Sequence, residues 1–360
     1  MAASLLRAAR TTALRARPGT AARRFASVDV TIREALNMAM DEEMEADDAV
    51  FVSDYNANRV LVFDGVPSAP NTLPSAVLGA PDLETDTFET HHFITNGCAA
   101  SNGESLCIGD GYDMRLYCWA TIPTESDQTP TGVFDFQDGV TSLAMHGDQL
   151  VGAGPMRGIR HWKSLPLNGE PPDALYEGQI GSVSFNRVTH VALDGTYFYA
   201  LDDQKALHGW PGVPEGNEAP AFTLQLEGPE PYIHSDGTYL TLSTRNSVAL
   251  YDVSTLETDP TPQLVTGFAH SSHLGQALAA DGHLFVTDFN HHRVYAWEDL
   301  QDALDGSPPD ALLGASDPDD VDPDTRRDGL FWPNRLAWDG QNLWVGEYKF
   351  SGRVVGFQRP

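Results

Sequence analysis

The sequence predicts an all-β protein made of repeated four-stranded units. Three observations support this prediction: a motif that recurs between Val50 and Pro360, Asp-Gly pairs between apolar runs, and 32 Gly with 24 Pro in 360 residues. Gly and Pro at this frequency are typical of many short strands joined by turns. Hydrophobic residues make up 41% of the chain, which is enough for a core, and all-β domains of this length commonly fold as one unit.

The recurring motif is an apolar strand, an acidic residue in a turn, and an Arg-Val pair that begins the next strand. Its clearest copies are 51–60, 285–294 and 344–354, and weaker copies occupy 107–119, 151–162, 199–210 and 240–252. Apolar runs that end in Asp-Gly precede several copies, as at 191–195, 278–282 and 336–340, and Asp-Gly between apolar runs is a strong hairpin signal. A Pro-containing connector and a further strand follow, as at 74–79 and 309–314. The result is seven units of four strands, spaced about 40–60 residues apart.

A four-stranded unit has two faces to bury, and a ring of such units buries them against one another. We therefore expect a β-propeller of seven blades, with six as the alternative. The first unit lacks a clean inner strand and the last lacks an outer strand. Residues 45–51 mirror 279–285, so the segment before Val50 is a candidate to complete blade one.

The pattern Val-x-Asp-aromatic-x-x-x-Arg-Val, followed by a Leu-Gly-x-x-Asp ending at 78–82, resembles the NHL-repeat family over residues 50–360. This resemblance implies a propeller, and the family includes amidating lyases that hold zinc with channel histidines and work with a Tyr and an Arg. The corresponding candidates here are Tyr232 and Arg335, with His190, His234 and His273 as metal ligands. These histidines do not occupy equivalent repeat positions and show no short metal-ligand spacing. We therefore expect no cofactor, with zinc or calcium as the alternative.

The N-terminal region carries two further signals. Residues 1–28 contain six Arg and no acidic residue, which is typical of a mitochondrial transit peptide, with processing expected near 24–27. Residues 29–52 resemble the start of the mature β subunit of mitochondrial pyruvate dehydrogenase, but 53–56 replace the Gly-Glu-Glu segment by which that family engages thiamine diphosphate. We expect a leader at 1–28, a segment at 29–49 with an amphipathic helix near 32–45 outside the propeller, and a propeller at 50–360. The expected location is the mitochondrion, or the cytoplasm if the leader comes from a fusion or an incorrect gene model.

Charge and cysteine content narrow the choice of partners. The 51 acidic residues outnumber 22 Lys and Arg, and the net charge of −29 repels nucleic-acid backbones. No run of 18 apolar residues occurs, so we expect no membrane helix. We also expect a monomer that binds an unidentified protein or small molecule. Three cysteines are too few for a disulfide framework, although Cys107 and Cys118 can face each other across a hairpin.

The innermost strands of a propeller line its central channel, where one ligand meets several blades. Aligning the units on their turn glycine places six residues at equivalent channel positions: Cys98, Ser142, His190, Tyr232, Ala277 and Arg335. Thr189, Gln276 and Asn334 precede three of them. The predicted ligand-binding ring is Ser142, His190, Tyr232, Gln276, Asn334 and Arg335. The charged pairs of the hairpins, Asp54 with Arg59, Asp288 with Arg293 and Glu347 with Arg353, are interpreted as structural, and His291 and His292 as solvated.

The function predicted from these features is a non-catalytic binding or scaffold propeller that presents its loop faces and central channel. The sequence contains no Gly-rich phosphate loop, Gly-x-Ser-x-Gly elbow or His-Glu-x-x-His motif. A metal-dependent propeller hydrolase or lyase is the alternative, because its ligands are scattered along the chain. A pyruvate dehydrogenase-related role through 29–52 is the second alternative.

Overall fold

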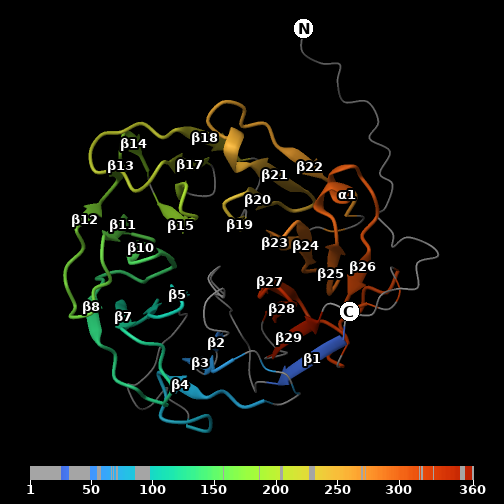
Figure 1. Cartoon of the computed structure of the whole chain (residues 1–360), viewed down its shortest axis with the longest axis horizontal. Coiled ribbons are helices and arrows are strands. Elements are labelled where there is room, and N and C mark those ends of the chain that lie inside the picture. Colours follow the sequence, from blue (N-terminus) through green and yellow to red (C-terminus); the bar gives the residue numbers. More distant parts are fainter. Residues whose placement is uncertain are drawn as a thin grey trace.

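The protein is a seven-bladed β-propeller in which antiparallel sheets stand in a ring (Figure 1). The computed structural model describes residues 26–31, 49–54, 58–65, 67, 69, 72–85, 98–156, 158–185, 187–202, 206–226, 232–268, 271, 273–315, 317, 319–326, 328–348 and 353–358; for 26–31 and 353 it describes the backbone only. Blades two to seven run from an inner strand outward, blade one is described from its second strand onward, and the ring confirms the predicted fold class and the count of seven.

The strands follow the chain around the ring. Blade one comprises β2 (Val50–Asp54), β3 (Arg59–Phe63) and β4 (Ala76–Leu78). Blade two comprises β5 (Cys98–Ser101), β6 (Leu106–Gly109), β7 (Arg115–Trp119) and β8 (Gly132–Asp135). Blade three comprises β9 (Ser142–His146), β10 (Gln149–Gly154), β11 (Gly158–Trp162) and β12 (Ala174–Tyr176), and a small hairpin of β13 (Gln179–Ile180) and β14 (Val183–Ser184) follows it. Blade four comprises β15 (Val188–Leu193), β16 (Phe198–Asp202), β17 (Ala206–Trp210) and β18 (Phe222–Gln225).

The remaining blades have the same order. Blade five comprises β19 (Tyr232–Ser235), β20 (Tyr239–Ser243), β21 (Val248–Asp252) and β22 (Gln263–Val265), with the 3-10 turn η2 (Val253–Thr255) between its last two strands. Blade six comprises β23 (Leu274–Ala280), β24 (His283–Asp288), β25 (Arg293–Trp297) and β26 (Ala311–Leu313), with helix α1 (Leu300–Leu304) before the last strand. Blade seven comprises β27 (Pro333–Trp338), β28 (Asn342–Glu347) and β29 (Arg353–Gln358), and its fourth strand is β1 (Ala26–Thr31).

The predicted Asp-Gly turns join the first two strands of a blade. Between β23 and β24 the loop consists of Asp281 and Gly282, with φ angles of 50° and 77°. A two-residue hairpin with positive φ at both positions matches the right-handed twist of the strands, and Asp-Gly tolerates it. All seven predicted hairpins between second and third strands are present as well.

The core lies between the blades. In the interface of blades six and seven, Leu278 and Phe285 pack with Leu336, Leu343 and Val355, all of them buried. Four blades also bury a tryptophan at the end of the third strand, and its indole N–H donates to a carbonyl of the following connector. These four bonds are Trp119 to Gln128, Trp162 to Glu170, Trp210 to Glu218 and Trp297 to Ser307, at 2.9–3.3 Å. They fix the connector over the blade edge while satisfying the buried indole.

The two ends of the described chain meet in blade seven. β1 pairs antiparallel with β29 from Ala26 opposite Gln358 to Thr31 opposite Arg353, and Figure 1 shows β1 along the outer edge of this blade. β1 therefore spans the boundary expected after residue 28, because it combines 26–28 of the expected leader with 29–31 of the segment that follows it. The helix expected near 32–45 lies outside the described residues.

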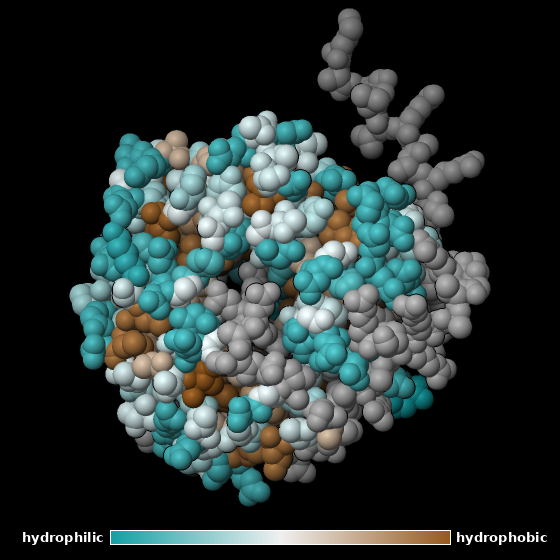
Figure 2. All heavy atoms as spheres, in the orientation of Figure 1, coloured by the Kyte–Doolittle hydropathy of each residue, from teal (hydrophilic) through white to brown (hydrophobic). Residues whose placement is uncertain are grey.

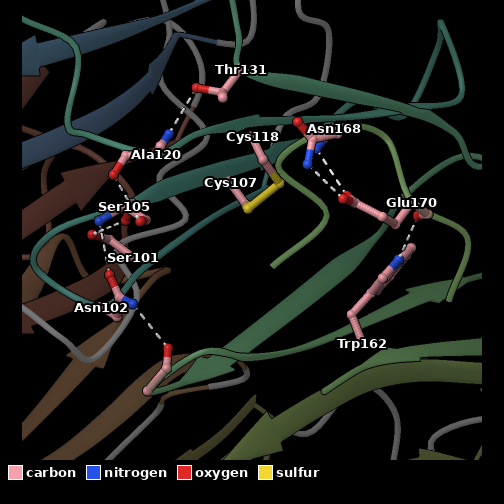
Figure 3. The surroundings of a disulfide bond; sticks show 11 residues. Ser101, Asn102, Ser105, Cys107, Cys118, Ala120, Thr131, Trp162, Asn168 and Glu170 are labelled. Carbon is pink, nitrogen blue, oxygen red and sulfur yellow. Dashed lines mark hydrogen bonds between the residues drawn. A yellow bond between two sulfur atoms is a disulfide. The ribbon is translucent and has the colours of Figure 1, made fainter. Parts of the chain in front are cut away.

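A disulfide joins two strands of blade two (Figure 3). Cys107 of β6 and Cys118 of β7 are directly opposed, and their sulfur atoms are 2.20 Å apart. Both are buried in a cluster that includes Trp162 of blade three. The cysteine count disfavoured this pairing, and that expectation is wrong, because Cys107 and Cys118 are bonded; Cys98 of β5 is outside the disulfide.

Candidate functional site

The central channel gathers residues from the inner strands of different blades. His190 lies on β15, Tyr232 on β19, and Asn334 and Arg335 on β27. In Figure 1 these strands stand around the centre of the ring, although they belong to blades four, five and seven. Residues separated by as many as 145 positions in the chain are in this way brought to one place.

Arg335 is the centre of this group. Its guanidinium carbon lies 4.6 Å from the centroid of the Tyr232 ring, in the geometry of a cation–π contact. Its charge also acts on the imidazole of His190. We call His190, Tyr232 and Arg335 the channel triad, because Arg335 interacts with both of the other two.

The imidazole of His190 is neutral at physiological pH. Burial lowers its pKa from 6.5 to about 4, and the positive charge of Arg335 lowers the pKa in the same direction. The side-chain atoms Nδ1 of His190 and Oδ1 of Asn334 are buried and have no hydrogen-bond partner among the described residues. Buried polar atoms are nearly always hydrogen-bonded, so these two are candidates for contact with a bound molecule.

Two other predicted ring residues join neighbouring blades. The Ser142 hydroxyl accepts a hydrogen bond from the Val191 amide at 3.1 Å and donates to the Val191 carbonyl at 3.3 Å. The Gln276 side-chain carbonyl accepts a hydrogen bond from the Leu336 amide at 2.8 Å. These contacts connect blade three to four and blade six to seven, so both side chains use polar atoms to hold the inner strands together.

The candidate metal ligands are distributed differently. His234 is buried on β19, and burial lowers its pKa to about 3. His273 precedes β23, and its ring packs edge-on against Phe289 with centroids 5.1 Å apart. In the part of the chain that the structure describes, no group of three or more His, Cys, Asp and Glu side chains is arranged to hold a metal ion.

The acidic residues of the hairpins organise the loops of one propeller face. Asp54 is fully buried and accepts a hydrogen bond from the Arg59 guanidinium at 3.0 Å, across the hairpin of blade one. Asp288, also fully buried, accepts hydrogen bonds from the Ser271 hydroxyl at 3.0 Å and the Tyr295 hydroxyl at 3.2 Å. Glu347 accepts a hydrogen bond from the Phe331 amide at 2.6 Å. These carboxylates are therefore structural hydrogen-bond acceptors.

The prediction that His291 and His292 are solvated is wrong for His292, which is 7% exposed. Its Nδ1 accepts a hydrogen bond from the Trp332 amide at 3.0 Å, and its ring lies against Phe331 and Trp332. His291 contacts Asp288 through Nδ1 at 2.9 Å. The sequence places both histidines in a turn, but the loop that packs over this turn comes from a region about 40 residues later in the chain.

Comparisons with known proteins identify the fold alone. No family model and no curated protein matches the sequence, so neither an NHL-repeat nor a pyruvate dehydrogenase relationship is shown. A chain from the crystal structure of a mitotic checkpoint complex superposes with a TM-score of 0.61 at 12% identity, covering 97% of this chain and 98% of its own. The computationally designed protein Ika8 gives a TM-score of 0.54 at 12% identity, covering 93% and 100%. In addition, no helix among the described residues is long and apolar enough to cross a membrane.

Proposed function

We propose that this propeller is a binding platform whose central channel holds a small organic acid, while its loop faces are available to protein partners. The observation that carries the proposal is the convergence of the channel triad from three blades, in which the buried Nδ1 of His190 has no hydrogen-bond partner among the described residues. We further propose that the blades are of the NHL type, because the repeat pattern at 51–60 and 285–294 resembles that family.

The chemistry of the channel favours an acidic ligand with further polar groups. A guanidinium presents a planar set of donors that matches a carboxylate, and the Tyr232 ring lies against the guanidinium of Arg335. Neutral His190 can donate or accept a hydrogen bond through Nδ1, and the Asn334 carbonyl can accept one. A buried polar atom without a partner costs about 1–3 kcal/mol, so a ligand that satisfies these atoms gains free energy by binding here.

The proposal is tested by calorimetry with a panel of small mono- and dicarboxylic acids. Wild-type protein is compared with Arg335→Gln, and Arg245→Gln serves as the matched control because Arg245 is exposed on the turn between β20 and β21. A hydrogen bond to a charged group contributes about 1.5–3 kcal/mol, so Arg335→Gln should weaken binding roughly 10- to 100-fold and Arg245→Gln should leave it unchanged. Failure of every acid to bind the wild type, or equal binding by the two variants, would contradict a ligand site at Arg335.

Metal analysis of the same preparations tests the enzymatic alternative. The binding-platform proposal predicts no stoichiometric metal in the purified protein. Zinc or calcium that is present at one equivalent and lost in His190→Gln, with the circular dichroism spectrum unchanged, would support a metal-dependent hydrolase or lyase in its place.

A further inference from the structure

Three inner strands of the propeller carry a β-bulge, and the bulges coincide with predicted channel residues. The pairing register shifts at these places: between Val188 and His190 in β15, between Leu274 and Ala277 in β23, and between Pro333 and Arg335 in β27. The other inner strands that the structure describes, β5, β9 and β19, pair without such a shift. A bulge redirects side chains and is frequent beside functional sites, so the bulges mark blades four, six and seven as the part of the ring that aims side chains into the channel.

The bulge of β27 is held by the preceding blade. Leu336 directly follows Arg335, and its amide donates to the side-chain carbonyl of Gln276 in β23 at 2.8 Å. A Cβ atom on Gly275 would lie 2.8 Å from the Asn334 carbonyl oxygen, so glycine is required for the two bulges to approach this closely. Gly275 and Gln276 therefore contact the backbone on both sides of Arg335.

The bulge of β15 is held in the same way. Val191 directly follows His190, and its amide donates to the hydroxyl of Ser142 in β9 at 3.1 Å. The inner strand of a blade has an open edge on its channel side, so an amide there has no ladder partner and needs an acceptor from elsewhere. Ser142 supplies this acceptor beside His190, as Gln276 does beside Arg335.

Both acceptors lie inside the ring, because Ser142 is 8% and Gln276 is 7% exposed. The outer face that Figure 2 shows is instead largely hydrophilic, with hydrophobic residues in separate patches. A buried side chain that bonds to the neighbouring strand can determine where the adjacent channel residue points. A group that contacts a ligand must be held within about 0.5 Å of its productive position, and the residues around it provide that accuracy.

We propose that Ser142 and Gln276 are positioning residues of the channel site, which present His190 and Arg335 to the bound acid without touching it. The proposal rests on the function proposed above. It assigns to these two residues a role different from the direct ligand contact that their place in the ring predicts. Each holds the amide next to a bulge, and the bulge sets the direction of the side chain that meets the acid.

Double-mutant cycles test the proposal by calorimetry with the acid of the panel that binds the wild type most tightly. Gln276→Met keeps the length of the side chain but removes the acceptor, and it should weaken acid binding roughly three- to tenfold. In the Arg335→Gln background the same substitution should have no further effect, because the group that Gln276 positions is gone. Ser142→Ala should weaken binding to a similar extent alone and should have no further effect in the His190→Gln background.

Ser126→Ala is the matched control for Ser142→Ala. The Ser126 hydroxyl, in the connector between β7 and β8 of blade two, also accepts a hydrogen bond from an amide of the neighbouring blade at 3.1 Å. The donor is Val77 in the outer strand of blade one, far along the blade from the inner strands. Ser126→Ala should therefore leave acid binding unchanged. Ser142→Thr keeps the hydroxyl and should bind the acid like the wild type.

Four results would overturn the proposal. Additive losses in both cycles would mean that Ser142 and Gln276 act independently of His190 and Arg335. A loss in Ser126→Ala equal to that in Ser142→Ala would show a general loosening of the propeller. Unchanged acid binding in Gln276→Met and Ser142→Ala, with circular dichroism spectra like that of the wild type, would remove the positioning role and leave the proposed function standing. Failure of every acid to bind the wild type would remove both.

Discussion

The burial of His190 predicts a specific loss of stability in acid. Its pKa falls from 6.5 to about 4 in the folded protein because of burial and the nearby charge of Arg335. Between these two values the unfolded chain binds a proton that the folded protein does not, so the free energy of unfolding decreases as the pH falls. The effect begins near pH 6.5, is complete near pH 4, and amounts to about 3 kcal/mol for a pKa difference of this size.

The assay is urea unfolding, followed by circular dichroism, at pH 7, 5.5 and 4. Wild type is compared with His190→Gln, which keeps a polar side chain but cannot titrate. Protonation of the many carboxylates destabilises both proteins to a similar extent, so the difference between them isolates His190. Wild type should lose about 3 kcal/mol more than the variant between pH 7 and 4. His146→Gln, at an exposed position that ends β9, controls for removal of any histidine.

Parallel stability curves for wild type and His190→Gln across this pH range would refute the reasoning. That result would mean that the imidazole is solvated in the channel, and the unsatisfied Nδ1 atom would then no longer support a ligand site.

Three further predictions concern the scaffold and the leader. Asp54→Ala leaves the guanidinium of Arg59, which is 6% exposed, without its buried carboxylate, and it should lower the free energy of unfolding in urea melts by about 3 kcal/mol or more. Lys163→Ala, which breaks an exposed contact with Glu215, should change the free energy of unfolding little. Equal effects of the two substitutions would contradict the argument for a stabilising buried pair. Denatured, unreduced protein should show one thiol by colorimetric titration and three after reduction, because Cys107 and Cys118 are bonded; three thiols before reduction would exclude the disulfide. Residues 1–28 fused to a fluorescent protein should direct it to mitochondria. A diffuse cytosolic signal would contradict the mitochondrial location that we expect from this segment.

Local signals made much of the fold predictable. Asp281-Gly282 specifies a hairpin through the backbone angles that these two residues tolerate, and that information is contained in adjacent positions. The tryptophans that end third strands are a further signal of the repeat. Trp119, Trp162, Trp210 and Trp297 each bond a carbonyl 8–10 residues later, so their spacing marks four blades.

The channel was predictable in position but not in chemistry. Alignment on the turn glycines placed Ser142, His190, Tyr232 and Arg335 on inner strands. It could not distinguish Ser142, which bonds the backbone of blade four, from His190, which has a buried atom without a partner. That distinction depends on how neighbouring blades approach each other, and such contacts join residues far apart in the sequence.

The closing strand of blade seven was not predicted, because residues 26–31 have no counterpart of the repeat motif. Their pairing with β29 covers an edge that would otherwise present unpaired backbone groups along 353–358. A ring closed by strands from both ends of the chain resists opening, since separating the blades then requires breaking this ladder. The strand therefore contributes to stability through its backbone, whatever its side chains are.

Proline substitutions at two consecutive positions of β1 test this closure. In an antiparallel ladder, successive amides point alternately toward the partner strand and away from it, so one of Val28 and Asp29 donates to β29 and the other points outward. Proline removes the amide hydrogen, which costs roughly 1–3 kcal/mol where the bond is needed and little on the open side of an edge strand. One variant of the pair, Val28→Pro or Asp29→Pro, should therefore lower Tm and speed hydrogen exchange in β29, and the other should match wild type. If neither variant changes Tm or exchange, residues 26–31 do not close the ring, and blade seven must be stable with three strands.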